Sequence, residues 1–148
     1  MRRFLIMAAL FLLSSCSPRV FPVQRDTVTQ VRTEIVERLV RDSIQALVIN
    51  VLQPLRTALG VEMPVNSGYR CSELNEAVGG VPTSQHVKGE AADIATAMPI
   101  RMARKAVEMG LPFDQMGIYP TFVHISHKLG GPQRGQVFYS KDYKGERL

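Results

Sequence analysis

The sequence predicts an α+β domain in which helices flank a small antiparallel sheet. Helical and strand patterns are mixed along the chain, without the regular strand–helix–strand alternation of a parallel sheet. Apolar residues at helical spacing fill residues 42–60, and alternating residues mark short strands at 90–95 and 122–126. A chain of 148 residues without internal repeats fits one such domain beside an N-terminal leader.

Residues 1–15 resemble a secretion signal. Two arginines precede an apolar core that is shorter than the about 20 residues needed to span a bilayer. The core ends at Cys16 in a run that resembles a bacterial lipobox, in which the cysteine becomes the lipidated first residue. We therefore expect an exported protein on the periplasmic side of the cell envelope, anchored to a membrane through Cys16. The alternative is an ordinary signal peptide with an incidental cysteine.

Residues 16–42 are expected to be a tether and stalk. Branched apolar and charged residues alternate in its second half, partly at strand spacing and partly at helix spacing, so a helix or a self-association segment is compatible with it. The net charge of +5 favours anionic envelope polymers as surroundings. The chain has no basic stripe interleaved with aromatic residues, which argues against nucleic acid as a partner.

The compact domain is expected over residues 43–140. Asp42 or Ser43 can cap its first helix, whose apolar residues share one face. Pro54 predicts a kink or break inside that helix, and Gly60 predicts its end.

Shorter elements follow this helix. Glycine and proline separate the segments, and Pro99 suits the first turn of a helix. The charged tail at 141–148 is expected to be loose. The expected strands are 63–70, 90–95, 115–119, 122–126 and 137–139, and the expected helices are 72–78 and 99–109.

His86, Asp93 and His124 are the candidate metal ligands. If the strands that carry Asp93 and His124 are neighbours, both side chains lie on one surface, and a loop brings His86 to it. Two imidazoles and one carboxylate leave a fourth position of Zn²⁺ open for water, as in a catalytic site. The alternative for each residue alone is an ordinary hydrogen-bonded side chain.

The surrounding motifs resemble the zinc D,D- and L,D-peptidases of the M15 type. That family acts on peptidoglycan stem peptides and shares a metal site with the Hedgehog signalling domain. The resemblance extends over about residues 47–139, and its most specific part is the motif Ser84-x-His86-x-x-Gly89-x-Ala91-x-Asp93. Further matching segments are Leu52–Arg56, Asn66–Arg70, Glu73–Gly80, Phe113–Gln115 and Phe122–Ser126.

The resemblance implies a fold of the Hedgehog/D-Ala-D-Ala peptidase type, with Zn²⁺ held by the two histidines and the aspartate. It also implies that Arg70 holds a substrate carboxylate or carbonyl, a role that suits a guanidinium fork. Ser84 would support the metal loop or touch the substrate. A structural arginine and a simple loop hydroxyl are the alternatives for these two residues.

The general base is the missing part of this pattern. Many relatives carry an acidic residue three positions before the last histidine, where this chain has Thr121. Its hydroxyl cannot serve as a base, and losing acid–base help costs about 10²–10⁴-fold in rate. Asp114 is the candidate replacement, and Glu90 and His127 are further options.

The sequence thus predicts an exported zinc metallopeptidase that hydrolyses peptidoglycan peptides as a carboxypeptidase or endopeptidase. Two alternatives stay open. One is a catalytically weak zinc module that binds wall peptides, which Thr121 favours. The other is a structural lipoprotein that acts through its stalk.

Overall fold

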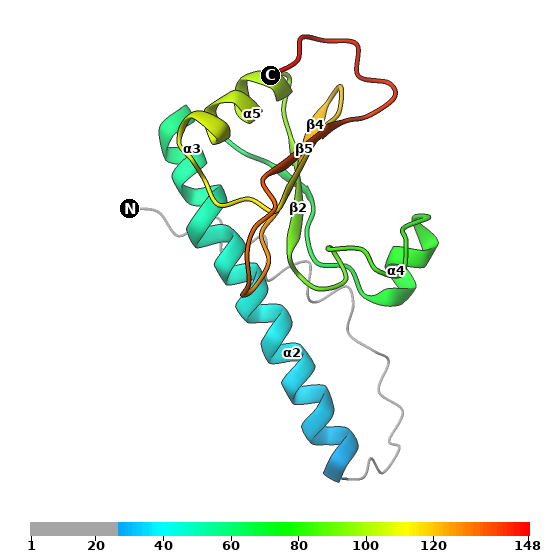
Figure 1. Ribbon diagram of the computed structural model, residues 1–148. Helices are drawn as coiled ribbons and strands as arrows, with labels where there is room; N and C mark the ends of the chain where they lie inside the picture. Colours follow the sequence, from blue (N-terminus) through cyan, green and yellow to red (C-terminus); the bar gives the residue numbers. More distant parts are fainter. Residues whose placement is uncertain (1–26) are drawn as a thin grey trace.

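The structure of the protein, a computed structural model, describes residues 27–148 (Figure 1). The expected signal segment, Cys16 and most of the tether lie outside the described residues. Helices cover one face of a small sheet, so the predicted α+β class is confirmed. No helix within residues 27–148 is both long and apolar enough to cross a membrane.

The sheet formed by the described residues is mixed. Three of its four strand pairings are antiparallel, but the last strand along the chain pairs parallel with its neighbour. The chain reverses direction after β4 and then joins the outer side of β3, so β5 must run parallel to β3. The expectation of a purely antiparallel sheet is corrected in this respect. The strand order is β1 (Val65–Ser67), β2 (Ala91–Ala95), β4 (Phe122–Ser126), β3 (Gln115–Ile118) and β5 (Gln136–Tyr139).

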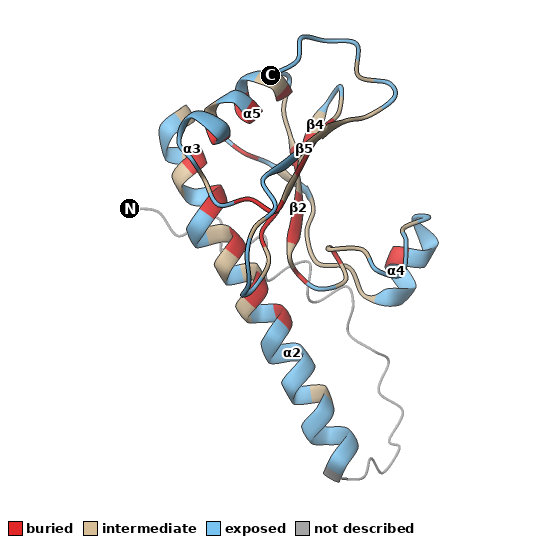
Figure 2. Ribbon diagram, viewed as in Figure 1, coloured by how far each residue is buried: buried red, intermediate tan, exposed pale blue. Residues whose placement is uncertain are grey.

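The long helix α2 (Thr27–Leu47) joins the expected stalk to the domain without a break. Residues 28–39 are largely exposed and project from the domain, and Val40 is the first buried position (Figure 2). Ser43 is buried inside the helix, so the predicted cap at Asp42 or Ser43 is wrong. The apolar residues of the stalk continue the helical spacing, which lets one helix pass through both segments.

A π-helical turn, η1 (Val48–Leu52), connects α2 to α3 (Gln53–Leu59). The backbone N–H of Gln53 donates to the carbonyl of Val48, five residues earlier. Pro54 follows directly and has no N–H to donate, which accounts for the widened turn. The expected irregularity near Pro54 is therefore confirmed, and Gly60 ends α3 with a left-handed φ of 66°.

The hydrophobic core lies between the helices and one face of the sheet. Leu55 of α3 and Ala103 of α5 (Pro99–Glu108) are fully buried against it. The strands contribute every second residue to this core, because successive side chains point to opposite faces. The opposite face is thereby left for polar residues. The strand residues of the core include Ile94, Met116, Ile118, Val123 and Ile125.

The C-terminal tail, residues 141–148, is mostly exposed but contacts the domain at several points. Tyr143 packs against the core, and the guanidinium of Arg147 lies 4.8 Å from the ring centre of Tyr139. The backbone N–H of Leu148 donates to the Tyr139 hydroxyl at 2.8 Å. Aromatic contacts thus connect this charged segment to the domain.

Candidate metal centre

One row of residues crosses the whole sheet on the face opposite the core. The strand register places one member on each strand, with Asp93 directly opposite His124. Strand alternation turns this row away from the helices, because the residues before and after Asp93, His124 and Gly117 belong to the core. From β1 to β5 the row is Ser67, Asp93, His124, Gly117 and Phe138.

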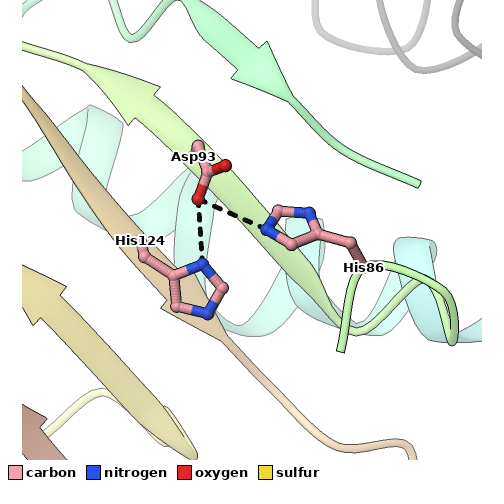
Figure 3. Close-up of side chains that lie close together, drawn as sticks. All are labelled: His86, Asp93 and His124. Atoms are coloured by element: carbon pink, nitrogen blue, oxygen red, sulfur yellow. Dashed lines mark hydrogen bonds and ion pairs between the residues drawn. The ribbon is translucent and has the colours of Figure 1, made fainter. Parts of the chain in front are cut away.

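Three donor atoms converge on this row. Figure 3 shows the rings of His86 and His124 directed at the carboxylate of Asp93. Asp93 Oδ1 lies 3.3 Å from His86 Nε2 and 2.9 Å from His124 Nδ1. All three ligand atoms lie within 4.8 Å of one another. The structure thus brings together the three residues that the sequence predicted as metal ligands.

The His86 ring is fixed in the tautomer that a metal ligand needs. His86 Nδ1 lies 2.7 Å from the carbonyl oxygen of Gly68, so Nδ1–H donates and the lone pair of Nε2 faces Asp93. The Ser84 hydroxyl accepts from the backbone N–H of His86 at 3.3 Å, which supports the loop. Gly89 closes the loop with a φ of 72°, and a Cβ there would stand 2.8 Å from the carbonyl oxygen of Val40.

Arg70 holds the other oxygen of Asp93. Arg70 Nη2 donates to Asp93 Oδ2 at 2.8 Å, and Arg70 Nε donates to the Ser67 hydroxyl at 2.7 Å. Burial raises the pKa of Asp93, but the adjacent imidazoles of His124 and His86 outweigh this effect and hold that pKa well below its usual range. Asp93 is therefore ionised at neutral pH, with Oδ1 directed at the two imidazoles.

Gln85 supports the third ligand and was not singled out from the sequence. Its Oε1 lies 3.5 Å from His124 Nε2, and its Nε2 donates to Asp114 Oδ2 at 2.9 Å. The second contact fixes the amide orientation, so the carbonyl end faces the ring. The sequence feature that could have indicated this role is the position of Gln85 between Ser84 and His86 in the motif.

Asp114 lies in a buried ion cluster, which corrects its assignment as the general base. Its side chain is 0% exposed and accepts hydrogen bonds from Arg134. Its Oδ1 also forms an ion pair with Lys128 Nζ at 2.9 Å. The hydrogen bonds from Arg134 lower the pKa of Asp114 well below its usual range, against the effect of burial. Both oxygens are engaged by cations, so Asp114 acts on the centre only through Gln85.

The other two base candidates also lie apart from the three donors. His127 is buried, with Nδ1 2.6 Å from the carbonyl of Pro112 and Nε2 3.2 Å from Asn50 Nδ2. Glu90 lies one residue before β2. It is two residues before the core residue Ala92, so strand alternation directs its side chain to the face opposite Asp93. Within residues 27–148, Asp93 is the only carboxylate in the metal-compatible cluster.

The donor set fits zinc. Tetrahedral coordination with bonds of about 2.0–2.1 Å places neighbouring donors about 3.3 Å apart. The separations from Asp93 Oδ1 are 3.3 Å and 2.9 Å, and all three donor atoms lie within 4.8 Å of one another. Each ligand also has an outer partner: Gly68 for His86, Arg70 for Asp93 and Gln85 for His124. Such partners orient ligands and fix tautomers in metal sites.

Comparison with known families decides the classification. A family model described as Peptidase M15 matches residues 23–126, which include all three donors. The chain belongs to the Peptidase M15 family. The resemblance read from the motif around His86 and Asp93 is thereby confirmed, and the M15 assignment makes the protein a peptidase. A search of curated proteins finds no match to the chain.

The M15 match begins four residues before α2 and extends to the end of β4. It therefore covers every ligand and the Arg70 and Gln85 supports. Asp114 lies within it too, whereas its partners Lys128 and Arg134 follow it in the chain.

Proposed function

We propose that this M15 peptidase is zinc-dependent and hydrolyses peptide bonds of peptidoglycan stem peptides as a D,D- or L,D-carboxypeptidase or endopeptidase. The observation that carries the proposal is the convergence of His86 Nε2, Asp93 Oδ1 and His124 Nδ1 within 4.8 Å. Three protein ligands leave one coordination position for water or substrate, which distinguishes catalytic from structural zinc sites.

The three ligands would hold the ion, and their outer partners would keep it in place. Bound zinc supplies a Lewis acid and lowers the pKa of a water molecule to about 7. Arg70 keeps Asp93 oriented, and Gly68 keeps the His86 lone pair directed at the site. The side chain of Arg70 is 18% exposed, which leaves an edge of its guanidinium available to a substrate carboxylate or carbonyl.

The proposed substrate class is based on the motif from Ser84 to Asp93, and the proposed location is based on residues 1–15. Peptidoglycan stems lie outside the cytoplasmic membrane, where a signal segment at residues 1–15 and a lipid on Cys16 would place the enzyme. The net positive charge favours approach to anionic wall polymers. Ser84 supports the metal loop in this proposal, and a direct contact with the peptide would be additional.

A muropeptide digest tests the proposal. The mature chain is incubated at neutral pH with purified muropeptides, with added zinc or with a chelator, and the products are separated by chromatography. We expect new peptides or released D-alanine with zinc, and none with the chelator or with His86→Ala. Intact muropeptides in the presence of bound zinc would rule out peptidoglycan stem peptides as the substrate.

One observation favours a second candidate, a zinc module that binds wall peptides and turns them over slowly. Thr121 is exposed in the β3–β4 turn, and no second carboxylate joins the cluster in the described part of the chain. Sedimentation of the zinc-loaded protein with insoluble peptidoglycan, without release of products, would support this candidate.

A further inference from the structure

Tyr119 lies one row away from the metal ligands on the same face of the sheet. It directly follows β3, and its backbone N–H donates to the carbonyl of Phe122 at 3.0 Å, closing the β3–β4 turn. Alternation from Gly117, which pairs with His124, puts the Tyr119 side chain on the ligand-bearing face. The turn that carries Thr121 therefore also carries a phenol toward the site.

Aromatic contacts fix the direction of the Tyr119 ring. It stacks on Phe122 with ring centres 4.1 Å apart and an interplanar angle of 12°, and it meets Phe138 edge-on at 6.4 Å. Its Cε2 lies 3.1 Å from the position that a Cβ would take at Gly117. The far end of the ring thus leans back along β3 toward the row that contains His124.

The room for this ring comes from the glycine. A Cβ at Gly117 would stand 2.4 Å from Phe138 Cζ, so a side chain there would displace both aromatic rings. Phe138 in turn lies 6.5 Å from the His124 ring, centre to centre. Tyr119, Phe122 and Phe138 therefore form an aromatic wall on one side of the metal centre.

The phenol hydroxyl is available to a ligand. Within residues 27–148, no hydrogen bond engages it, and the residue is only partly buried. Burial raises the pKa of Tyr119, and the negative charge of Asp93 raises it further. The hydroxyl is consequently a neutral donor across the neutral range.

We propose that the Tyr119 hydroxyl donates a hydrogen bond to the carbonyl oxygen of the scissile peptide bond as that oxygen gains negative charge. This inference rests on the proposed peptidase function and adds a catalytic residue to it. A fixed donor aimed at developing charge lowers the barrier without reorganisation, and the stack on Phe122 supplies that fixity. Tyr119 does not replace the missing base, because it donates rather than accepts.

Tyr119→Phe is the direct test, since it removes one oxygen and keeps the stacked ring. Removing one such donor typically lowers kcat by about 10²–10³-fold. We expect that loss with KM changed less than about twofold, because the hydrogen bond strengthens only in the transition state. Binding of a phosphinate isostere of the cleaved bond, measured by calorimetry, should weaken by about 10–100-fold.

Tyr139→Phe is the matched control. Tyr139 lies on the core side of β5, and its hydroxyl accepts from the backbone N–H of Leu148, away from the metal row. It should leave kcat and phosphinate binding at wild-type values. Zinc content and the unfolding midpoint are measured for both variants, and Tyr119→Phe should change neither.

The outcomes separate this inference from the proposed function. If the wild type cleaves muropeptides and Tyr119→Phe matches it in kcat and phosphinate affinity, the role of Tyr119 is wrong and the peptidase function stands. A loss that comes with reduced zinc content or a lower unfolding midpoint also overturns it, because the role would be structural. If the zinc-loaded wild type neither cleaves peptides nor binds the phosphinate, both proposals fail together.

Discussion

Asp93 and His124 face each other across β2 and β4, 31 residues apart in the chain, with 2.9 Å between Asp93 Oδ1 and His124 Nδ1. The other carboxylate oxygen is bonded to Arg70. Each oxygen of Asp93 thus has a separate partner, and only one is directed at the imidazoles. Because its two oxygens have different partners, substitutions of the metal ligands and of Arg70 should have different effects on zinc binding.

Removing a ligand should abolish stoichiometric zinc binding. His86→Ala and His124→Ala each delete one of three donors, and the affinity should fall by more than the about 10–100-fold that loss of an outer partner costs. Metal analysis of the purified proteins, with competition against a chelator of known affinity, measures this. His127→Gln is the control and should keep its zinc, because His127 bonds to Pro112 and Asn50 instead. Zinc retained by His86→Ala would contradict the ligand set.

Replacing Arg70 by lysine should weaken the centre while keeping the charge. Arginine donates from two nitrogens, to Asp93 and to Ser67, and a lysine ammonium has no planar fork to do so. We expect zinc affinity to fall about tenfold in a competition titration. Arg104→Lys on α5 is the matched control, since Arg104 makes only an exposed ion pair with Glu146. Equal affinities for Arg70→Lys and the wild type would show that Asp93 needs no such support.

Asp114→Asn should destabilise the fold and loosen His124. The substitution removes a buried negative charge that accepts from Arg134 and Lys128, and it presents an amide to Gln85 in place of a carboxylate. A hydrogen bond to a charged group contributes about 1.5–3 kcal/mol, so the free energy of unfolding in urea should fall by about that amount. Glu108→Gln, in an exposed pair with Lys105, should have little effect. An unchanged unfolding free energy in Asp114→Asn would exclude a stabilising role for the cluster.

The same carboxylate predicts a pH dependence of stability. Hydrogen bonds from Arg134 hold the pKa of folded Asp114 well below the about 3.9 of an unfolded aspartate. A group with a lowered folded pKa stabilises the protein fully above its unfolded pKa, and that contribution is lost as the pH falls toward the folded pKa. The difference in unfolding free energy between wild type and Asp114→Asn should therefore be constant from pH 7 to about 5 and shrink below about pH 4. Urea titrations across this range measure this difference. A difference that grows as the pH falls would contradict a lowered pKa of folded Asp114.

Gly117→Ala should cost stability through a clash and not through backbone strain. The new Cβ would stand 2.4 Å from Phe138 Cζ, and overpacking of this kind costs about 1–3 kcal/mol. Adding Phe138→Leu should recover part of the loss, because the smaller side chain vacates the space. Unfolding free energies of the two single variants and the double variant form the test. Strict additivity would mean that the ring and the glycine do not interact.

Sequence reasoning located the ligands because the relevant signals are local. Alternation on β2 and β4 fixes which residues of each strand share a face with Asp93 and His124, and a glycine closes the loop after His86. The motif and the two strand patterns were therefore sufficient to predict one surface for all three donors.

The supporting residues could not be predicted in the same way, because their roles depend on distant partners. The position of Asp114 in the sequence suits a general base, but Arg134, 20 residues downstream, engages both of its oxygens. The parallel pairing of β5 likewise depends on which edge the chain joins after β4. The continuity of α2 was hidden because charged and branched residues mask a helical period when no partner covers them.

Metal binding depends on the register of the strands, because Asp93 and His124 belong to the row of residues that crosses the sheet. A slip of one residue in any strand would turn its member of the row to the helix-covered side. Asp93 and His124 meet only after pairing distant in sequence is complete, which is a slow and late event in folding. The ion should therefore be captured only by chains in which β2 and β4 are paired in register and the loop that carries His86 is in place.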